Sequence, residues 1–218
     1  MQVETALKTR ISIRAFLDKP VPEASVRDIL DTARWSPSGG NLQPWRMIVV
    51  SGAARDAVAE MAMKTLATNP LGEAEEFPIY PSGLGEPYRT RRYKVGEDLY
   101  ALLGIPREDK AARLGWVSQN FNFFGAPLGL FFVIDRGMGN GQWAHLGMLM
   151  QSIALAAHAK GLATCMQEAW GMVRKSAHAH FGLAEHEVIY CGMALGYPDG
   201  EAAVNTLRSD RAEVSEIA

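Results

Sequence analysis

The sequence predicts a three-layer α-β-α sandwich, a single domain in which a mixed central sheet lies between layers of helices. Helix-like and strand-like segments alternate along the 218 residues, without a clean linker or an internal repeat. The runs 128–134 and 188–195 are apolar throughout, which is typical of strands covered by helices on both faces. Apolar residues make up 48% of the chain, enough for a substantial core.

Hydrophobic periodicity predicts the helices. In segment 25–34 apolar residues recur at i, i+3, i+4 and i+7, and Ser25 can cap the start. Segment 143–160 is apolar almost all round, which predicts full burial in the core or at a subunit interface. The other expected helices cover residues 3–9, 53–66, 93–103, 108–122 and 173–181.

Four strands are expected, at 47–50, 128–134, 162–166 and 188–195, the first of them buried. Between 70 and 90, four prolines and three glycines interrupt regular structure. Long irregular segments in compact domains are usually lids or binding loops, so we expect a lid-like insertion at about 70–120. The polar tail at 205–211 would be ordered only if it docks on the domain.

Composition excludes several classes of protein. A net charge of −2 is unlike that of a general nucleic-acid binder, and no apolar run reaches the roughly 20 residues that span a bilayer. The start of the chain lacks the apolar core of a signal peptide. Cys165 and Cys191 lie in apolar runs, which predicts buried free thiols in a reducing cytoplasm. His178 and His180 have no Glu or Cys at ligand spacing, so no metal is expected.

A basic segment near the N-terminus alternates strictly. In an extended chain Arg10, Ser12 and Arg14 share one face, and the two isoleucines between them share the other. Two guanidiniums flanking a hydroxyl form a compact anion site, because arginine donates in a planar fork that suits phosphate. The alternative is an edge strand with solvated charges.

A polar loop, Trp35–Trp45, follows the helix at 25–34. It is rich in Pro, Ser, Gly and Asn, and so offers backbone N–H groups and hydroxyls to a flat, hydrogen-bonding ligand. The alternative is an ordinary helix-to-strand connection. Farther along, residues 89–94 carry four positive charges. They predict a cationic rim for an anionic substrate or the phosphate of NADPH, or else a solvated helix start.

Together these stretches resemble the FMN-dependent nitroreductase family. The pattern Arg-x-Ser-x-Arg-x-Phe begins at Arg10, and Pro-Ser-Gly-Gly-Asn-x-Gln-Pro-Trp begins at Pro37, at the family's spacing. The similarity covers about residues 8–211, and the insertion together with Phe123–Pro127 is most similar to the nitrobenzoate-reductase branch. The resemblance implies an α+β fold and an intertwined homodimer with two active sites at its interface.

The resemblance also implies roles for individual residues. Arg10, Ser12 and Arg211 would hold the FMN phosphate. Arg208 would assist, and which of the two tail arginines touches phosphate stays open because Ser209 stands where relatives carry a basic residue. Arg14 would reach the pyrimidine edge of the flavin. The remaining expected residues are Pro37, Ser38 and Asn41 from the other subunit, Gln167, Glu168 and Ala169 near flavin N5, and Arg89, Arg91 and Arg92 for the substrate.

The activity implied is a ping-pong reaction in which NADH or NADPH reduces FMN by hydride transfer. Arg14 would then stabilise negative charge on the reduced ring. A nitroaromatic compound, nitrobenzoate included, or a quinone would accept two electrons in the same space. No catalytic acid or nucleophile is named, because the flavin carries the chemistry. The alternatives are the same fold with reductive dehalogenation, ene reduction or flavin fragmentation, a non-catalytic flavin-binding protein, and a fold without flavin.

Overall fold

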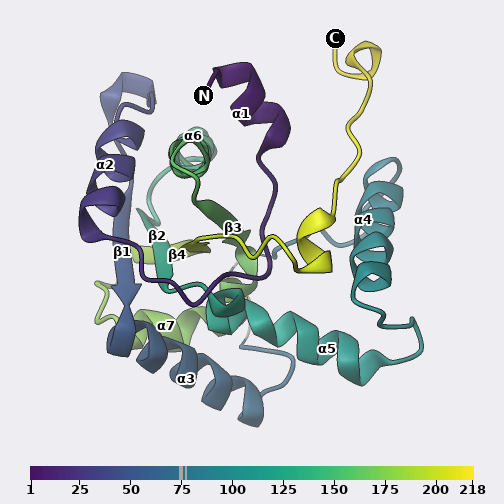
Figure 1. Ribbon diagram of the computed structural model, residues 1–218. Helices are drawn as coiled ribbons and strands as arrows, with labels where there is room; N and C mark the ends of the chain where they lie inside the picture. The colour runs from purple at the N-terminus through teal and green to yellow at the C-terminus, as the bar shows by residue number, and fades with distance from the viewer. Residues whose placement is uncertain (74–75, 77) are drawn as a thin grey trace.

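The computed structural model describes residues 1–218 except 74, 75 and 77, so the part of the expected insertion that falls on those three lies outside it. The architecture is helices on both sides of one four-stranded sheet (Figure 1). The α-helices are α1 Val3–Thr9, α2 Glu23–Ala33, α3 Gly52–Thr68, α4 Tyr88–Leu102, α5 Lys110–Ser118, α6 Asn140–Ala159 and α7 Arg174–His180. The strands are β1 Arg46–Ser51, β2 Leu128–Asp135, β3 Ala163–Gln167 and β4 Glu187–Gly196.

The sheet has the strand order β1-β2-β4-β3, and all three ladders are antiparallel. The expectation of a mixed sheet is therefore wrong for these four strands. The one parallel pairing among the described residues is an isolated bridge between Ser12 and Thr164. A continuously apolar strand indicates that helices cover both faces of the sheet. It does not indicate whether neighbouring strands are parallel or antiparallel.

Side chains alternate between two hydrophobic clusters, one on each face of the sheet. Leu130 and Phe132 of β2 pack with α2 and α6, whereas Phe131 and Val133 pack with α3, α7 and the Phe121–Phe124 turn. Figure 1 shows α6 on one side of the sheet and α3 and α7 on the other. The expected three-layer α-β-α sandwich is confirmed.

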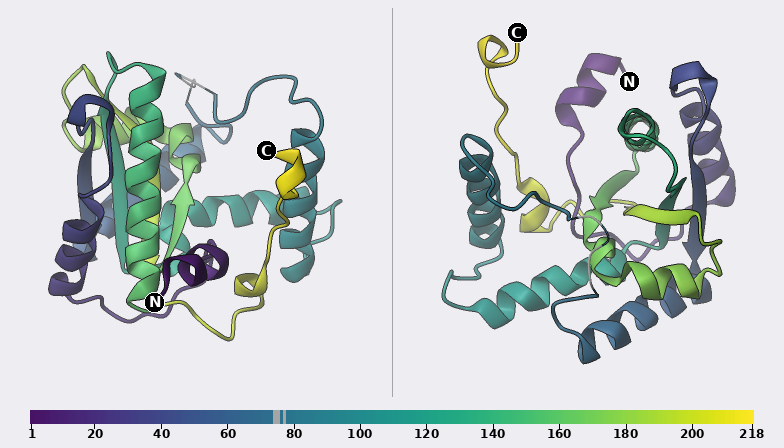
Figure 2. Two further views of the ribbon diagram at one scale, coloured as in Figure 1. Left: turned by 90° about the horizontal axis from the view of Figure 1, so that it is seen from above. Right: turned by 180° about the vertical axis from the view of Figure 1, so that it is seen from behind.

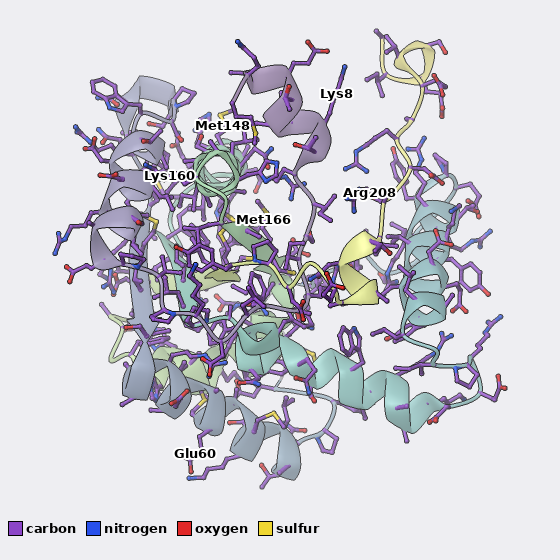
Figure 3. The ribbon with its side chains drawn as sticks, in the orientation of Figure 1. Lys8, Glu60, Met148, Lys160, Met166 and Arg208 are labelled. Atoms are coloured by element: carbon purple, nitrogen blue, oxygen red, sulfur yellow. The ribbon has the colours of Figure 1, made fainter. Side chains whose placement is uncertain are left out.

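Three local expectations are corrected. Helix α2 begins at Glu23 and not at a Ser25 cap, because the amide of Ser25 already donates to Pro22 O inside the first turn. Only Val50 is buried in β1, because this strand lies at the edge of the sheet. Within one chain helix α6 is not fully buried, because Met148 is 45% exposed on the side of the helix away from the sheet (Figure 3), and its burial at a subunit interface stays a prediction.

Helix α4 stands away from the sheet, and the C-terminal tail runs beside it (Figure 2). It starts at Tyr88, five residues before the expected helix, so Arg89, Arg91 and Arg92 are helical. The tail is ordered: a 3-10 turn, Ala203–Thr206, precedes an extended stretch. Among the described residues no helix has the length and apolarity needed to span a membrane. Both cysteines are free and buried, as expected.

Candidate functional site

The basic N-terminal segment runs beside β3. Ser12 forms its bridge with Thr164, and the amide of Ile13 donates to Thr164 O at 3.0 Å. Ile13 is buried, whereas Arg14 on the opposite face borders a cavity. The expected alternation is only partly present: Arg10, Ser12 and Arg14 line one cavity together, but Ile11, expected on the face of Ile13, lines it too.

Asn205 fixes this segment in place. Its Oδ1 accepts from the Arg14 amide at 2.8 Å, and its Nδ2 donates to Ala15 O and Asp199 O, both at 2.8 Å. The buried amide thus joins the N-terminal segment to the tail. Sequence reasoning missed Asn205, because nothing in a polar tail distinguishes an asparagine that becomes buried from one that stays in solvent.

A small cavity of about 170 Å³, called here the arginine cavity, lies between this segment and the tail. Its described lining holds three guanidiniums and two hydroxyl side chains but no carboxylate. Burial, and secondly the like charge of Arg211, lower the pKa of Arg10 from its usual value. The Nε of Arg10 is buried without a hydrogen-bond partner among the described residues. The lining residues are Arg10, Ile11, Ser12, Arg14, Val95, Leu207, Ser209 and Arg211.

The two tail arginines take different positions. Arg211 lines the arginine cavity, and its guanidinium donates to Ser209 Oγ at 2.7 Å. Arg208 lines a separate cavity of about 380 Å³ beside His158, and its guanidinium donates to Asn205 O and Leu207 O. Arg10 borders both cavities. Figure 3 shows Arg208 on the tail.

A large cavity of about 960 Å³ adjoins the arginine cavity, and Arg14 lines both. Gln167, Glu168 and Ala169, where β3 ends, lie in its wall, and their expected place near flavin N5 stays a prediction. Gln167 Nε2 donates to Asn120 O at 2.7 Å, but the buried Oε1 has no partner among the described residues. The arrangement suits a ligand with an anionic group at one end and a flat polar body at the other.

Aromatic side chains form much of the remaining wall. Sequence reasoning did not predict this aromatic wall, because its residues come from segments far apart in the chain. The hydroxyl of Tyr190 donates to Glu168 Oε1 at 3.3 Å. Burial, and secondly the charge of Glu168, raise the pKa of Tyr190 to about 12. The aromatic lining residues are Tyr80, Tyr100, Trp116, Phe124 and Tyr190.

The polar loop is not part of either cavity within this chain. Pro37, Ser38 and Asn41 are absent from both described linings. Ser38 Oγ accepts from the Gln43 amide at 2.9 Å, and Gly39 lies against His145 of α6. Their expected contribution from a second subunit stays a prediction.

The three arginines of α4 have different surroundings. Arg92 lines the large cavity. Arg89 is paired with Glu86 at 2.7 Å, and Arg91 with Glu216 at 2.9 Å, and neither is among the described lining residues of the large cavity.

The nitroreductase family model matches residues 7–197, most of the chain. This chain belongs to the nitroreductase family. The resemblance in its two N-terminal motifs is thus confirmed.

Two curated relatives cover nearly all of this nitroreductase-family chain. It is 36% identical to a nitrobenzene nitroreductase of Ectopseudomonas oleovorans over 99% of this chain and 95% of the relative. It is also 36% identical to a 4-nitrobenzoate reductase of Pseudomonas putida over 95% of this chain and 90% of the relative.

A solved structure shows the same fold. The FMN and NADPH-dependent nitroreductase NfnB from sphigopyxis sp. strain HMH matches with a TM-score of 0.97 at 42% identity. The match covers all of this chain and 98% of that one. The described part of this chain therefore has the α+β nitroreductase fold.

Proposed function

We propose that this protein is an FMN-dependent oxidoreductase that uses NADH or NADPH to reduce nitroaromatic compounds. The observation that carries the proposal is the position of Arg14, which lines both the arginine cavity and the large cavity. FMN has the matching shape, a phosphate at one end and a flat ring at the other. The names of the full-length relatives support the same activity.

The residues present fit this cofactor. The arginine cavity gathers positive charge without a carboxylate in its described lining, and a phosphate would compensate that charge. Arg10 Nε and Gln167 Oε1 are buried without partners in the described protein, so each can bond to a polar ligand. Arg10, Ser12 and Arg211 would hold the phosphate. Arg208 would assist only indirectly, through Arg10, because both residues line the separate cavity beside His158.

When bound, FMN accepts two electrons from a reduced nicotinamide and passes them to the substrate. The protein binds the cofactor and the substrate and orients them for electron transfer. Arg14 places a fixed positive charge at the pyrimidine edge, where negative charge develops on reduction. Gln167, Glu168 and Ala169 would present polar groups along the ring near N5. The aromatic wall of the large cavity offers stacking surfaces to a flat acceptor, a nitroaromatic or a quinone.

The same proposal includes a homodimer in the cytoplasm, with Pro37, Ser38 and Asn41 lining the partner's flavin. Trp35 is 77% exposed at the start of this loop, and Leu42 is exposed beside Asn41. Met148 on α6 adds to this apolar surface, which a second subunit would cover. Residues 1–218 would form one domain, with the 70–120 insertion as a lid over the ring.

An absorbance spectrum of the purified protein, before and after anaerobic addition of NADH or NADPH, tests the proposal. Flavin bands that bleach on adding nucleotide, and return on adding nitrobenzene, are expected. Flavin that stays oxidised would contradict the reductase activity. A colourless protein that FMN cannot reconstitute would contradict the cofactor as well.

A further inference from the structure

One cation in the basic cluster of α4 lacks the acidic partner that the other three have among the described residues. The cluster consists of Arg89, Arg91, Arg92 and Lys94. Arg89 and Arg91 are paired with Glu86 and Glu216 as described above. The ammonium of Lys94 lies 2.6 Å from Asp98 and 3.2 Å from Asp210. Arg92 has no carboxylate partner among the residues that the structure describes. No described carboxylate therefore compensates its charge, which is available to an anionic ligand.

The guanidinium of Arg92 is held over an aromatic ring. Its central carbon lies 3.9 Å from the centroid of the Tyr80 ring, a cation–π distance. Both residues line the large cavity. Stacking occupies the face of the guanidinium and leaves the in-plane N–H groups available, which is the geometry that grips a carboxylate at two points.

Few charges compete with Arg92 in the large cavity. Its described lining contains two other charged side chains, Arg14 and Glu168. Arg14 lies at the end that joins the arginine cavity, and Glu168 accepts a hydrogen bond from Tyr190. Much of the remaining wall is aromatic. The combination is a space with several aromatic residues in its wall and one cation that no described carboxylate pairs and that the proposed flavin does not use.

We propose that Arg92, positioned by Tyr80, binds the carboxylate of an aromatic nitro acid, so that nitrobenzoates are preferred over uncharged nitroarenes. This inference rests on the proposed function, because the bound acid would be the electron acceptor. A guanidinium also binds phosphate, so the 2′-phosphate of NADPH is the other anion the experiment must distinguish.

The test compares kcat/KM for 4-nitrobenzoate and for its uncharged analogue 4-nitrobenzamide in wild type and Arg92→Gln. We expect a loss of about tenfold or more on nitrobenzoate, as for a lost charge-assisted hydrogen bond, and less than about twofold on nitrobenzamide. Arg91→Gln is the matched control, since it removes the same charge one residue away, and it should change neither value by more than about twofold. Arg92→Lys keeps the charge but loses the planar, two-point hydrogen bonding of the guanidinium, so it should keep only part of the kcat/KM for nitrobenzoate.

Equal losses on both substrates would overturn the proposal. A loss in kcat/KM for NADPH but not for NADH, with kcat/KM for nitrobenzoate unchanged, would overturn it in favour of the nucleotide phosphate. Binding of benzoate to the oxidised holoenzyme, followed by the flavin spectrum, gives a readout without turnover and should weaken in Arg92→Gln alone. If wild type reduces neither substrate, the proposed function fails, while unchanged benzoate affinity in Arg92→Gln would separately reject the role of Arg92.

Discussion

The arginine cavity and the basic cluster of α4 hold similar amounts of positive charge but treat it in opposite ways. Arg10, Arg14 and Arg211 converge with no carboxylate in the described lining. On α4, by contrast, three of four cations are paired with acidic side chains. The sequence alone shows two basic stretches of comparable density.

The difference teaches that the partners of a charge, more than its presence, identify a ligand site. Converging like charges oppose folding, and the pKa of Arg10 is lowered by burial first and by the like charge of Arg211 second. Such an arrangement is retained where a ligand compensates it. Paired charges on an exposed helix are already satisfied and contribute little to binding.

The largest effect is expected from Arg10→Gln. Loss of a charge-assisted contact to phosphate should weaken FMN binding by roughly 10- to 100-fold. The FMN-free protein should keep its Tm or gain slightly, because a pKa below the usual value means that folding disfavours the charged guanidinium. Fluorescence titration with FMN and thermal melts of the FMN-free protein measure the two quantities. A large fall in the Tm of the FMN-free variant would indicate a structural role instead.

The two tail arginines sharpen the comparison further. Arg211→Gln should weaken FMN binding by about tenfold, because Arg211 lines the arginine cavity with Ser12 and Arg14. Arg208→Gln should cost less than about threefold, since its guanidinium bonds to backbone carbonyls and lines a different cavity. The same FMN titration, run on both variants, would reject the assignment if their order were reversed.

The smallest effect is expected from Arg91→Gln in the FMN titration. Its ion pair with Glu216 is exposed, and such pairs contribute about 0–1 kcal/mol to stability. FMN affinity should stay within about twofold of wild type, and urea unfolding should shift only slightly. A loss as large as that of Arg10→Gln would remove the distinction between paired and unpaired cations.

What could be predicted from sequence was what local periodicity encodes. Alternation placed Arg10, Ser12 and Arg14 on one face, and apolar repeats located the helices and strands to within a few residues, except at the start of α4. The direction of the strands and the exposure of β1 could not be predicted, because both depend on partners distant in the chain. Asn205 and the aromatic wall were missed for the same reason.

The candidate site residues also differ in whether the sequence alone could assign them. The resemblance placed Gln167, Glu168 and Ala169 at the end of β3, where the large cavity lies. The separation of Arg92 from Arg89 and Arg91 depends on helical phase and on acids contributed by other segments, among them the tail. A basic run in the sequence contains neither kind of information.

The hydrogen bonds of Asn205 have a consequence for biosynthesis. Arg14 and Asn205 are 191 positions apart, so a ribosome takes about 10 to 40 seconds to travel between them. During that interval the nascent chain carries Arg10 and Ser12 but not the residues that close the arginine cavity and anchor it. Under the proposed role of Arg211 in holding the phosphate, FMN would bind only after translation has passed Arg211, and would not assist the folding of the segments made before it.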